Sequence, residues 1–261
     1  MKWFSSGLCM KMRFTPDNRA GGLGQSDVAL PVRSRRGAGR FLGFGAESAA
    51  PSPRNENRGS DLTTLICGRR SVRRFLERPV PAETVARVLE AARWAPSAHN
   101  RQPWRFLIVE EPERKTRLAA AMGERLAFDR IASGDSAGDI ERDVARSRTR
   151  ITLSPLLILV CMTLEDMDRY PDRRRSDAER IMAVQSTAMS VQNMLLAAAA
   201  EGLGACWMCA PLFCPDVVTG AFDLPPRWEP QALISIGYQE GEGRERPRRP
   251  LSELALGWKR S

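Results

Sequence analysis

The sequence predicts a single domain of the α+β class. Segments with the helical periodicity of about 3.6 residues alternate with short apolar segments of strand length, and the helices outnumber the strands. Apolar residues make up 43% of the 261-residue chain, which is enough for a sizeable core. No apolar run approaches the roughly 18 residues that a membrane-spanning helix needs, so we expect a soluble protein.

The first 58 residues differ in composition from the remainder. They are rich in Gly, Ser, Pro and Arg and have no helical or strand periodicity, which is typical of a disordered tail. Residues 1–60 hold ten Lys or Arg and four Asp or Glu, so they carry +6 of the net charge of +9. Such a tail can bind nucleic acid, but a solvated tail is the simpler interpretation. We therefore expect a basic tail over residues 1–58 and a folded domain over residues 59–261.

Capping residues and an apolar stripe predict the first two elements of this domain. A short helix is expected to begin at Ser60 and Asp61, whose side chains are good N-caps, and to end near Gly68. An amphipathic helix follows from Pro81 to Ala95, where the next residue is a proline that disfavours helical backbone before it. The buried stripe of this helix consists of Val85, Val88, Leu89 and Ala92.

The later elements are predicted from the lengths of the apolar segments. They are the strands 104–110, 155–163, 205–208 and 231–238 and the helices 112–127, 139–150 and 178–202. The helix over residues 178–202 is apolar or small nearly all round, so it is expected to be buried in a core or a subunit interface. Residues 244–257 are expected to form an extended C-terminal arm. The strands would make one sheet of about four.

The cysteines suggest neither a disulfide framework nor a strong metal site. There are six, and they are scattered. The segment CWMC, from Cys206 to Cys209, has the spacing of redox and zinc sites, but a zinc site needs further ligands and His99 is the only histidine. Thiols packed in a strand and a loop are the simpler interpretation. Because the N-terminus also lacks the continuous apolar segment of a signal peptide, a cytoplasmic location is expected.

Three polar clusters could carry chemistry. The first, RRSVR, suits a phosphate group because guanidinium groups lie beside a hydroxyl; it consists of Arg69, Arg70, Ser71 and Arg73. The second, PSAHNRQPW, offers neutral donors and acceptors from Ser97, Asn100 and Gln102. The third, RERPRRP, lies on a proline-stiffened arm and could cap an anion with Arg246, Arg248 and Arg249. Taken singly, a basic cluster of this kind is more often an exposed turn.

The clusters occur in a recognisable order. R-R-S-V-R-x-F is followed by P-S-x-x-N-x-Q-P-W-x-F, then by an Ala-rich helix running into A-E-G-L-G-x-x-W, then by G-Y and a late R-x-R-R-P. From residue 61 to about residue 255 the chain therefore resembles the nitroreductase family of flavoproteins. The resemblance implies a central, mainly antiparallel sheet of four to five strands flanked by helices. It also implies an intertwined homodimer that binds FMN at its interface.

The resemblance further implies roles for individual residues. Arg69 and Ser71, with Arg70 beside them, match contacts to the FMN phosphate, and Arg73 matches a basic residue near the flavin pyrimidine edge. A loop from the other subunit would line the flavin with Pro96, Ser97, Ala98, Asn100 and Gln102, although Ala98 replaces a serine common in the family. Backbone N–H groups near flavin N5 and O4 would come from Gly202, Leu203 and Gly204. Arg246 and Arg248 would close on the phosphate.

The physical chemistry of a flavin fits these roles. A fixed cation such as Arg73 lowers the cost of the negative charge that a reduced flavin holds near N1 and O2. A close backbone approach to N5 would explain glycine at positions 202 and 204, because glycine has no Cβ. The nearly all-apolar helix over residues 178–202 would be buried in the dimer.

A narrower resemblance concerns residues 185–218 and the segment DIERDVARSRTRI upstream of them. Both are similar to the nitroreductase-like domain of the enzyme that completes coenzyme F-420. That similarity implies reduction of an anionic enol-pyruvyl (dehydro) deazaflavin precursor to its lactyl form, by hydride transfer from reduced FMN. The upstream segment could steer such a substrate by the positive charge of Arg142, Arg146, Arg148 and Arg150. Alternatively, these arginines form a solvated helix face whose charge is balanced by acidic neighbours.

Two alternative functions stay open, and so does the role of the single histidine. A generic NAD(P)H-dependent nitroreductase or quinone reductase would carry the same motifs, as would a protein that binds a flavin or deazaflavin without turnover. His99 lies between Ala98 and Asn100, where its side chain would face the substrate as a contact or a proton donor. The other interpretation is an ordinary loop imidazole that the backbone satisfies.

Overall fold

The computed structural model describes residues 58–241 and 243–257, so the expected tail lies outside the described residues apart from Arg58. All described elements belong to one compact unit, residues 56–261. Its first helix, α1, spans Arg58–Gly68 and ends where the sequence predicts. Within the described part of the chain, no helix is long and apolar enough to cross a membrane.

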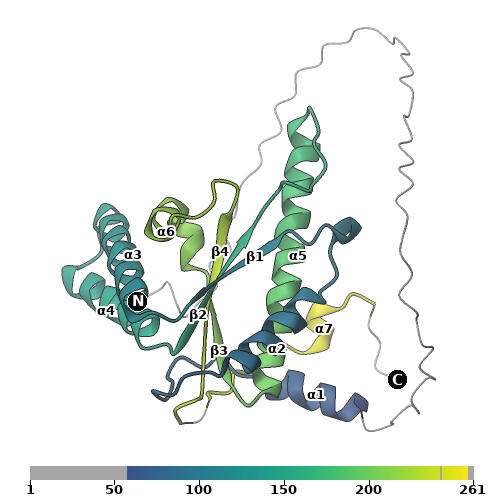
Figure 1. The fold of residues 1–261 in the computed structure, drawn as a ribbon, viewed down its shortest axis with the longest axis horizontal. Coiled ribbons are helices and arrows are strands. Elements are labelled where there is room, and N and C mark those ends of the chain that lie inside the picture. The colour runs from purple at the N-terminus through teal and green to yellow at the C-terminus, as the bar shows by residue number, and fades with distance from the viewer. Residues whose placement is uncertain (1–57, 242, 258–261) are drawn as a thin grey trace. The chain divides into compact units, whose positions relative to one another are not determined.

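A single antiparallel sheet of four strands forms the centre of the domain (Figure 1). The strands are β1 (Trp104–Val109), β2 (Leu156–Met162), β3 (Gly204–Met208) and β4 (Glu229–Gly237), in the spatial order β1-β2-β4-β3. All three pairings are antiparallel. The predicted α+β class and the predicted strands are therefore confirmed, with ends that differ by one or two residues.

Helices cover both faces of the sheet because its two central strands are apolar on both sides. Ile158 and Ile234, which pair across β2 and β4, face α2 (Ala82–Arg93) and α5 (Arg173–Ala200). Their neighbours Leu159 and Leu233 face the opposite layer. That layer is made of α3 (Pro112–Ala132), α4 (Ala137–Thr152) and α6 (Pro215–Phe222). Burial of each such side chain contributes about 1.5–3 kcal/mol.

Four elements differ from their predicted form, and the first is α3, which continues to Ala132, five residues beyond the predicted end. Helix α5 begins five residues before the predicted start, because the side chain of Asp172 accepts a hydrogen bond from Arg175 N (3.0 Å) and caps a polar first turn that apolar periodicity does not detect. Helix α6 was not predicted, and a 3-10 turn, η2 (Ala210–Phe213), precedes it. The expected extended arm contains the short helix α7 (Leu251–Leu254).

A buried ion-pair network joins α3 to α4. Arg130, which is 4% exposed, donates to Asp135 (Nε–Oδ2, 2.6 Å) and to Asp143, and Asp143 also accepts from Arg146. Removing one partner of a buried pair leaves an uncompensated charge, which costs several kcal/mol. The network therefore fixes how α4 lies against the domain, and with it the position of Arg150 at the end of that helix.

Candidate functional site

The RRSVR loop is attached to the outer edge of the sheet. Val72 N donates to Ala205 O of β3 (3.0 Å), and Leu76 N donates to Tyr238 O just after β4 (2.9 Å). The approach is so close that a Cβ on Gly204 would lie 2.7 Å from Val72 Cβ and Cγ1. Glycine at position 204 is therefore required by the chain's own packing, which is a different reason from the flavin approach that the sequence suggested.

The end of α5 uses two of the backbone amides that the sequence assigned to a flavin. Gly202 adopts φ +72°, and Gly202 N donates to Ala199 O (3.1 Å) while Leu203 N donates to Ala198 O (2.8 Å). This is the Schellman pattern, in which a glycine just beyond the helix satisfies its last carbonyls. What Gly202 leaves open is its Cα side, where an added Cβ would meet nothing within 4 Å.

A cavity of about 360 Å³ brings two of the predicted segments together. It is lined by the end of α1, by Arg69 and Arg70, and by Gly202 to Ala205 together with Gln239. Arg69 is half-buried, and its guanidinium group has no hydrogen bond or ion pair with any described residue. A partly desolvated guanidinium without a carboxylate partner favours an anionic ligand.

The C-terminal arm passes beside the same cluster. Arg70 donates from Nη1 to Cys67 O (2.6 Å), and its Nη2 lies 3.8 Å from Glu245 Oε1. Gly243 lies so close that a Cβ there would be 2.7 Å from Arg70 Cβ. Arg246 and Arg248 follow in exposed positions, with Arg248 donating to Arg246 O (3.0 Å). The first and third polar clusters are thus neighbours in the fold.

Further arginines form a like-charged group on the α4 side of this loop. Burial lowers the pKa of Arg150, and the charges of Arg73 and Arg146 lower it further. Burial raises the pKa of Cys206, although the nearby charges of Arg73, Arg150 and Arg69 oppose that rise. The positive charges of three arginines therefore act on one buried thiol of β3.

The basic face of α4 is only partly what the sequence suggested. Arg142 pairs with Asp139 and Arg146 pairs with Asp143, which supports the interpretation of a solvated, internally balanced face for these two residues. Arg148 is exposed. Arg150 belongs with the RRSVR cluster instead, a role that sequence reasoning missed because residues 73 and 150 are brought together only by the fold.

The second predicted segment, residues 96–102, adopts a strained conformation. His99, Asn100 and Gln102 have positive φ values of 49°, 55° and 49°, a backbone region that costs non-glycine residues about 1–3 kcal/mol each. Ser97 Oγ accepts from Gln102 N (3.0 Å), and Ser186 Oγ of α5 accepts from Ala98 N (3.3 Å). The hydrogen bonds hold the loop so that three polar side chains face outwards.

His99 has an exposed side chain with no hydrogen bond to any described residue. Among the described residues, no backbone group therefore supports the interpretation of a loop imidazole satisfied by the backbone. Pro96 and Asn100 are also exposed, whereas Ser97 and Ala98 are half-buried against α5. In the described residues, no group of three metal-ligating side chains is present. Cys206 is packed in the core and Cys209 is exposed, as expected for thiols of a strand and a loop.

The second cluster is far from the first within one chain. Ser186, which holds the loop, precedes Ala200, the last residue of α5, by 14 residues, which corresponds to about 21 Å at the helical rise of about 1.5 Å per residue. Gly202 follows just beyond that end of the helix. Figure 1 shows α1 near the C-terminal end of α5 and the segment before β1 beside a higher part of that helix. One chain therefore does not bring both clusters around one small molecule.

Comparison with known proteins agrees with this architecture. Residues 66–238 match the sequence profile described as the nitroreductase family. The chain belongs to the nitroreductase family. A nitroreductase-family protein from Desulfovibrio desulfuricans, solved in complex with FMN, is 30% identical, with a TM-score of 0.60 over 77% of this chain and 98% of that one.

Two curated relatives show the range of activities among similar proteins. A 5,6-dimethylbenzimidazole synthase from Rhodospirillum rubrum is 32% identical over 208 residues, which are 76% of this chain and 88% of the relative. An NADH dehydrogenase from Thermus thermophilus is 27% identical over 220 residues, which are 75% of this chain and 95% of the relative. Membership of the nitroreductase family thus establishes an oxidoreductase fold, and the acceptor depends on the site.

Proposed function

We propose that this nitroreductase-family protein is a homodimeric, FMN-dependent enzyme that transfers electrons from NAD(P)H to small organic acceptors such as nitroaromatics and quinones. The observation that carries the proposal is the half-buried Arg69, which lines the 360 Å³ cavity without an anionic partner among the described residues. The FMN complex of the Desulfovibrio relative supports the identity of the anion. With a nitro compound, the balanced reaction is NAD(P)H, a proton and the nitro group giving NAD(P)⁺, a nitroso group and water.

The residues of this chain fit a flavin phosphate and a flavin ring. Bound FMN would supply the hydride chemistry that amino-acid side chains cannot. Arg69 would bind the phosphate, and Ser71, Arg246 and Arg248 would add donors to it. Arg73 and Arg150 would bring positive charge to the pyrimidine edge, where they stabilise the reduced, anionic ring. The open Cα side of Gly202 would let the ring lie close to the backbone.

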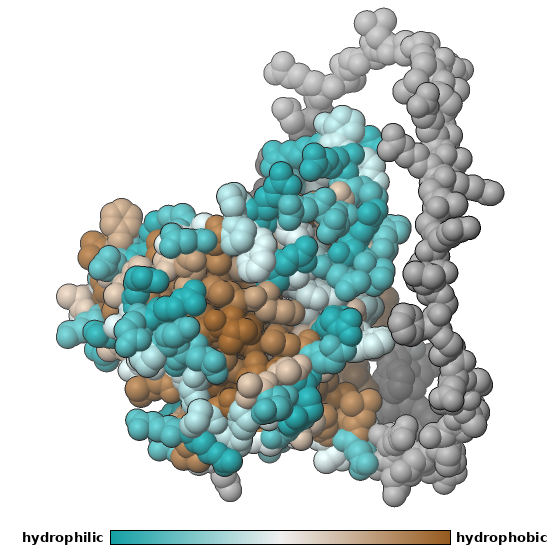
Figure 2. Space-filling model, in the orientation of Figure 1, coloured by the Kyte–Doolittle hydropathy of each residue, from teal (hydrophilic) through white to brown (hydrophobic). Residues whose placement is uncertain are grey.

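A second subunit would supply the rest of the site. Because the segment 96–102 lies about 21 Å along α5 from the helix end that precedes Gly202, it would line the flavin that the partner's arginines hold. Exposed apolar side chains on α5 and just after α2 offer a surface for the partner: Trp94, Ile181, Val184 and Met189. Figure 2 shows apolar surface gathered between the α3–α4 layer and α5 on the face in view. A standard-size interface buries about 800 Å² of accessible surface, polar and apolar together, on each chain.

His99 would stand over the flavin from that second subunit. Its exposed imidazole could donate a hydrogen bond or a proton to the acceptor. His99→Gln keeps a hydrogen-bond donor but cannot transfer a proton, whereas His99→Ala removes both functions. A proton donor predicts that both variants lose turnover to a similar extent. A simple contact predicts that glutamine restores most of the loss, and full activity in both variants would exclude His99 from the mechanism.

The deciding experiment uses the full chain purified with its own ligand. We expect the absorbance bands of bound flavin, release of FMN on denaturation, and oxidation of NADH or NADPH with menadione or a nitroaromatic as acceptor. Protein without flavin that does not bind added FMN would contradict the proposal. Bound flavin without turnover would favour the non-catalytic alternative.

Two more specific activities are tested with the same preparation. The similarity of residues 185–218 to the coenzyme F-420 enzyme supports the dehydro deazaflavin precursor, which should gain the mass of two hydrogens when incubated with the reduced protein. The Rhodospirillum relative supports a search for 5,6-dimethylbenzimidazole among the products. The assay with the fastest turnover at equal enzyme concentration identifies the acceptor class.

A further inference from the structure

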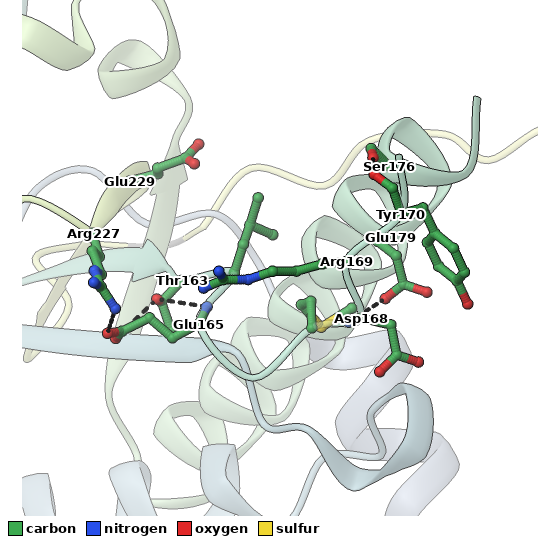
Figure 3. Close-up of a pocket in the computed structure, with 11 residues that line it drawn as sticks. Thr163, Glu165, Asp168, Arg169, Tyr170, Ser176, Glu179, Arg227 and Glu229 are labelled. Atoms are coloured by element: carbon green, nitrogen blue, oxygen red, sulfur yellow. Dashed lines mark hydrogen bonds and ion pairs between the residues drawn. The ribbon is translucent and has the colours of Figure 1, made fainter. Parts of the chain in front are cut away.

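A second cavity, of about 480 Å³, lies at the loop that joins β2 to α5 (Figure 3). Residues 163–165 and 167–170 line it from the loop, and Ser176 and Glu179 line it from the first turns of α5. Arg227 lines it from the segment before β4, and Glu229 lines it from the start of that strand. Its volume is within the range of small-molecule sites, about 300–1,000 Å³. The cavity is separate from the one at Arg69, with which it shares no lining residue.

The carboxylates of this cavity are already engaged. Three of them have an arginine partner: Glu165 with Arg227 (2.8 Å), Asp168 with Arg101 (2.7 Å) and Glu229 with Arg180 (2.9 Å). The fourth, Glu179, is 7% exposed and accepts a hydrogen bond from Asp168 N (3.3 Å). The acidic side chains thus fix the loop and the helix start, and their charge is mostly balanced.

Arg169 is the cation of this cavity that has no hydrogen bond or ion pair with any described residue. Figure 3 shows its side chain extending from the loop towards Thr163, across the space between Arg227 and Glu179. Leu164 and Met167 supply apolar lining, and Tyr170 supplies an aromatic ring. A small molecule with a carboxylate for Arg169 and an apolar or aromatic body fits this combination.

The cavity is connected to the strained loop. The Arg101–Asp168 ion pair (Nη2–Oδ1, 2.7 Å) joins the segment 96–102 directly to the cavity loop. The strained loop is also attached to α5 beyond Glu179. There Ser186 Oγ accepts a hydrogen bond from Ala98 N and donates one to the carbonyl of Met182 (2.7 Å). A molecule in the cavity would therefore lie beside the residues that the proposed function places over the flavin.

We propose that this cavity is the subsite for the acceptor, and that Arg169 selects acceptors that bear a carboxylate over neutral ones. The proposal rests on the proposed function, because it assigns the cavity to the oxidising half of that reaction. It adds a substrate class, small aromatic or apolar acids, and names the residue that recognises the acid.

Two acceptors with the same nitro group test it. Nitrobenzene and 4-nitrobenzoate differ by the carboxylate alone, and both are assayed with the FMN-loaded full chain. In Arg169→Gln, the KM for 4-nitrobenzoate should rise about three- to tenfold, since an exposed arginine pairs more weakly than a buried one. The KM for nitrobenzene, the FMN content and the melting temperature should stay unchanged. Arg169→Lys should recover part of the loss.

Arg174→Gln is the matched control, because Arg174 is an exposed arginine five residues further along that does not line the cavity. It should leave both KM values unchanged. Equal changes for the two acceptors in Arg169→Gln, or none, would overturn the subsite while leaving the reductase activity established. If the parent protein neither binds flavin nor turns over any acceptor, the proposed function fails. Calorimetric titration with 4-nitrobenzoate then decides the cavity alone: it must bind to the parent and more weakly to Arg169→Gln.

Discussion

Replacing Gly204 with alanine is expected to lower the melting temperature of the domain and to weaken FMN binding together. The new Cβ would lie 2.7 Å from Val72 Cβ and Cγ1 and 2.8 Å from Cγ2, closer than side-chain carbons approach one another. Val72 is held by its own hydrogen bond to Ala205 O (3.0 Å) and is 6% exposed, so it has little room to move.

The magnitude follows from the packing. Because no flexible side-chain end can yield, the overlap should cost about 1–3 kcal/mol, the usual range for overpacking a core. For a domain of this size that corresponds to a fall of roughly 2–12 °C in melting temperature. Val72 lies between Ser71 and Arg73, so displacing it moves the arginine loop away from the cavity. The dissociation constant for FMN should increase as a result.

Thermal unfolding and FMN titration measure the two effects. Gly220→Ala is the control, because position 220 lies inside α6 and an added Cβ meets nothing within 4 Å. Alanine favours a helix over glycine by about 1 kcal/mol, so this variant should melt at a higher temperature and bind FMN as the parent does. A Gly204→Ala protein as stable as the parent, with the same FMN affinity, would refute the account of how the loop is attached.

Three further outcomes are expected. Arg69→Gln should weaken FMN binding about ten- to a hundredfold, because a hydrogen bond to a charged group is lost. Riboflavin, which has no phosphate, should bind to this variant as it binds to the parent. The control is Arg74→Gln, because the side chain of Arg74 is 77% exposed beside Glu240. Alkylation at about pH 8, read by peptide mass spectrometry, should modify Cys67 and Cys209 in the native protein but not Cys161 or Cys214, because burial raises the pKa of those two thiols to about 12 and about 11. The hydrogen bond with Arg125 lowers the pKa of Asp216, so the ion pair between α3 and α6 stabilises the fold above the ordinary aspartate pKa of 3.8. This stability is lost as the pH falls through the lowered pKa. Asp216→Asn should therefore flatten the acidic part of the plot of melting temperature against pH, and an unchanged plot would show that the pair contributes nothing.

The sequence by itself determined the elements whose signal is local. The continuous apolar run of β2 identifies a strand buried on both faces, and the stripe from Val85 to Ala92 identifies α2. The order of the polar clusters, together with the Ala-rich helix that runs into A-E-G-L-G-x-x-W and the following G-Y, was enough to indicate the nitroreductase family, which the comparisons confirm. The similarity of residues 185–218 and of the segment DIERDVARSRTRI to the coenzyme F-420 enzyme led to a narrower expectation, reduction of the F-420 precursor, which stays a prediction for the substrate assays.

The tertiary structure alone decided what depends on residues far apart in the chain. Gly204 is required because Val72 approaches it, Gly202 N and Leu203 N are used by the helix end, and Arg150 joins Arg73 although 77 positions separate them. The separation of the 96–102 loop from the arginine cluster, and the cavity at Arg169, are likewise properties of packing. Periodicity and capping indicate which secondary structure each segment adopts and which of its faces is buried. Which distant side chains share a cavity is decided only when the segments pack.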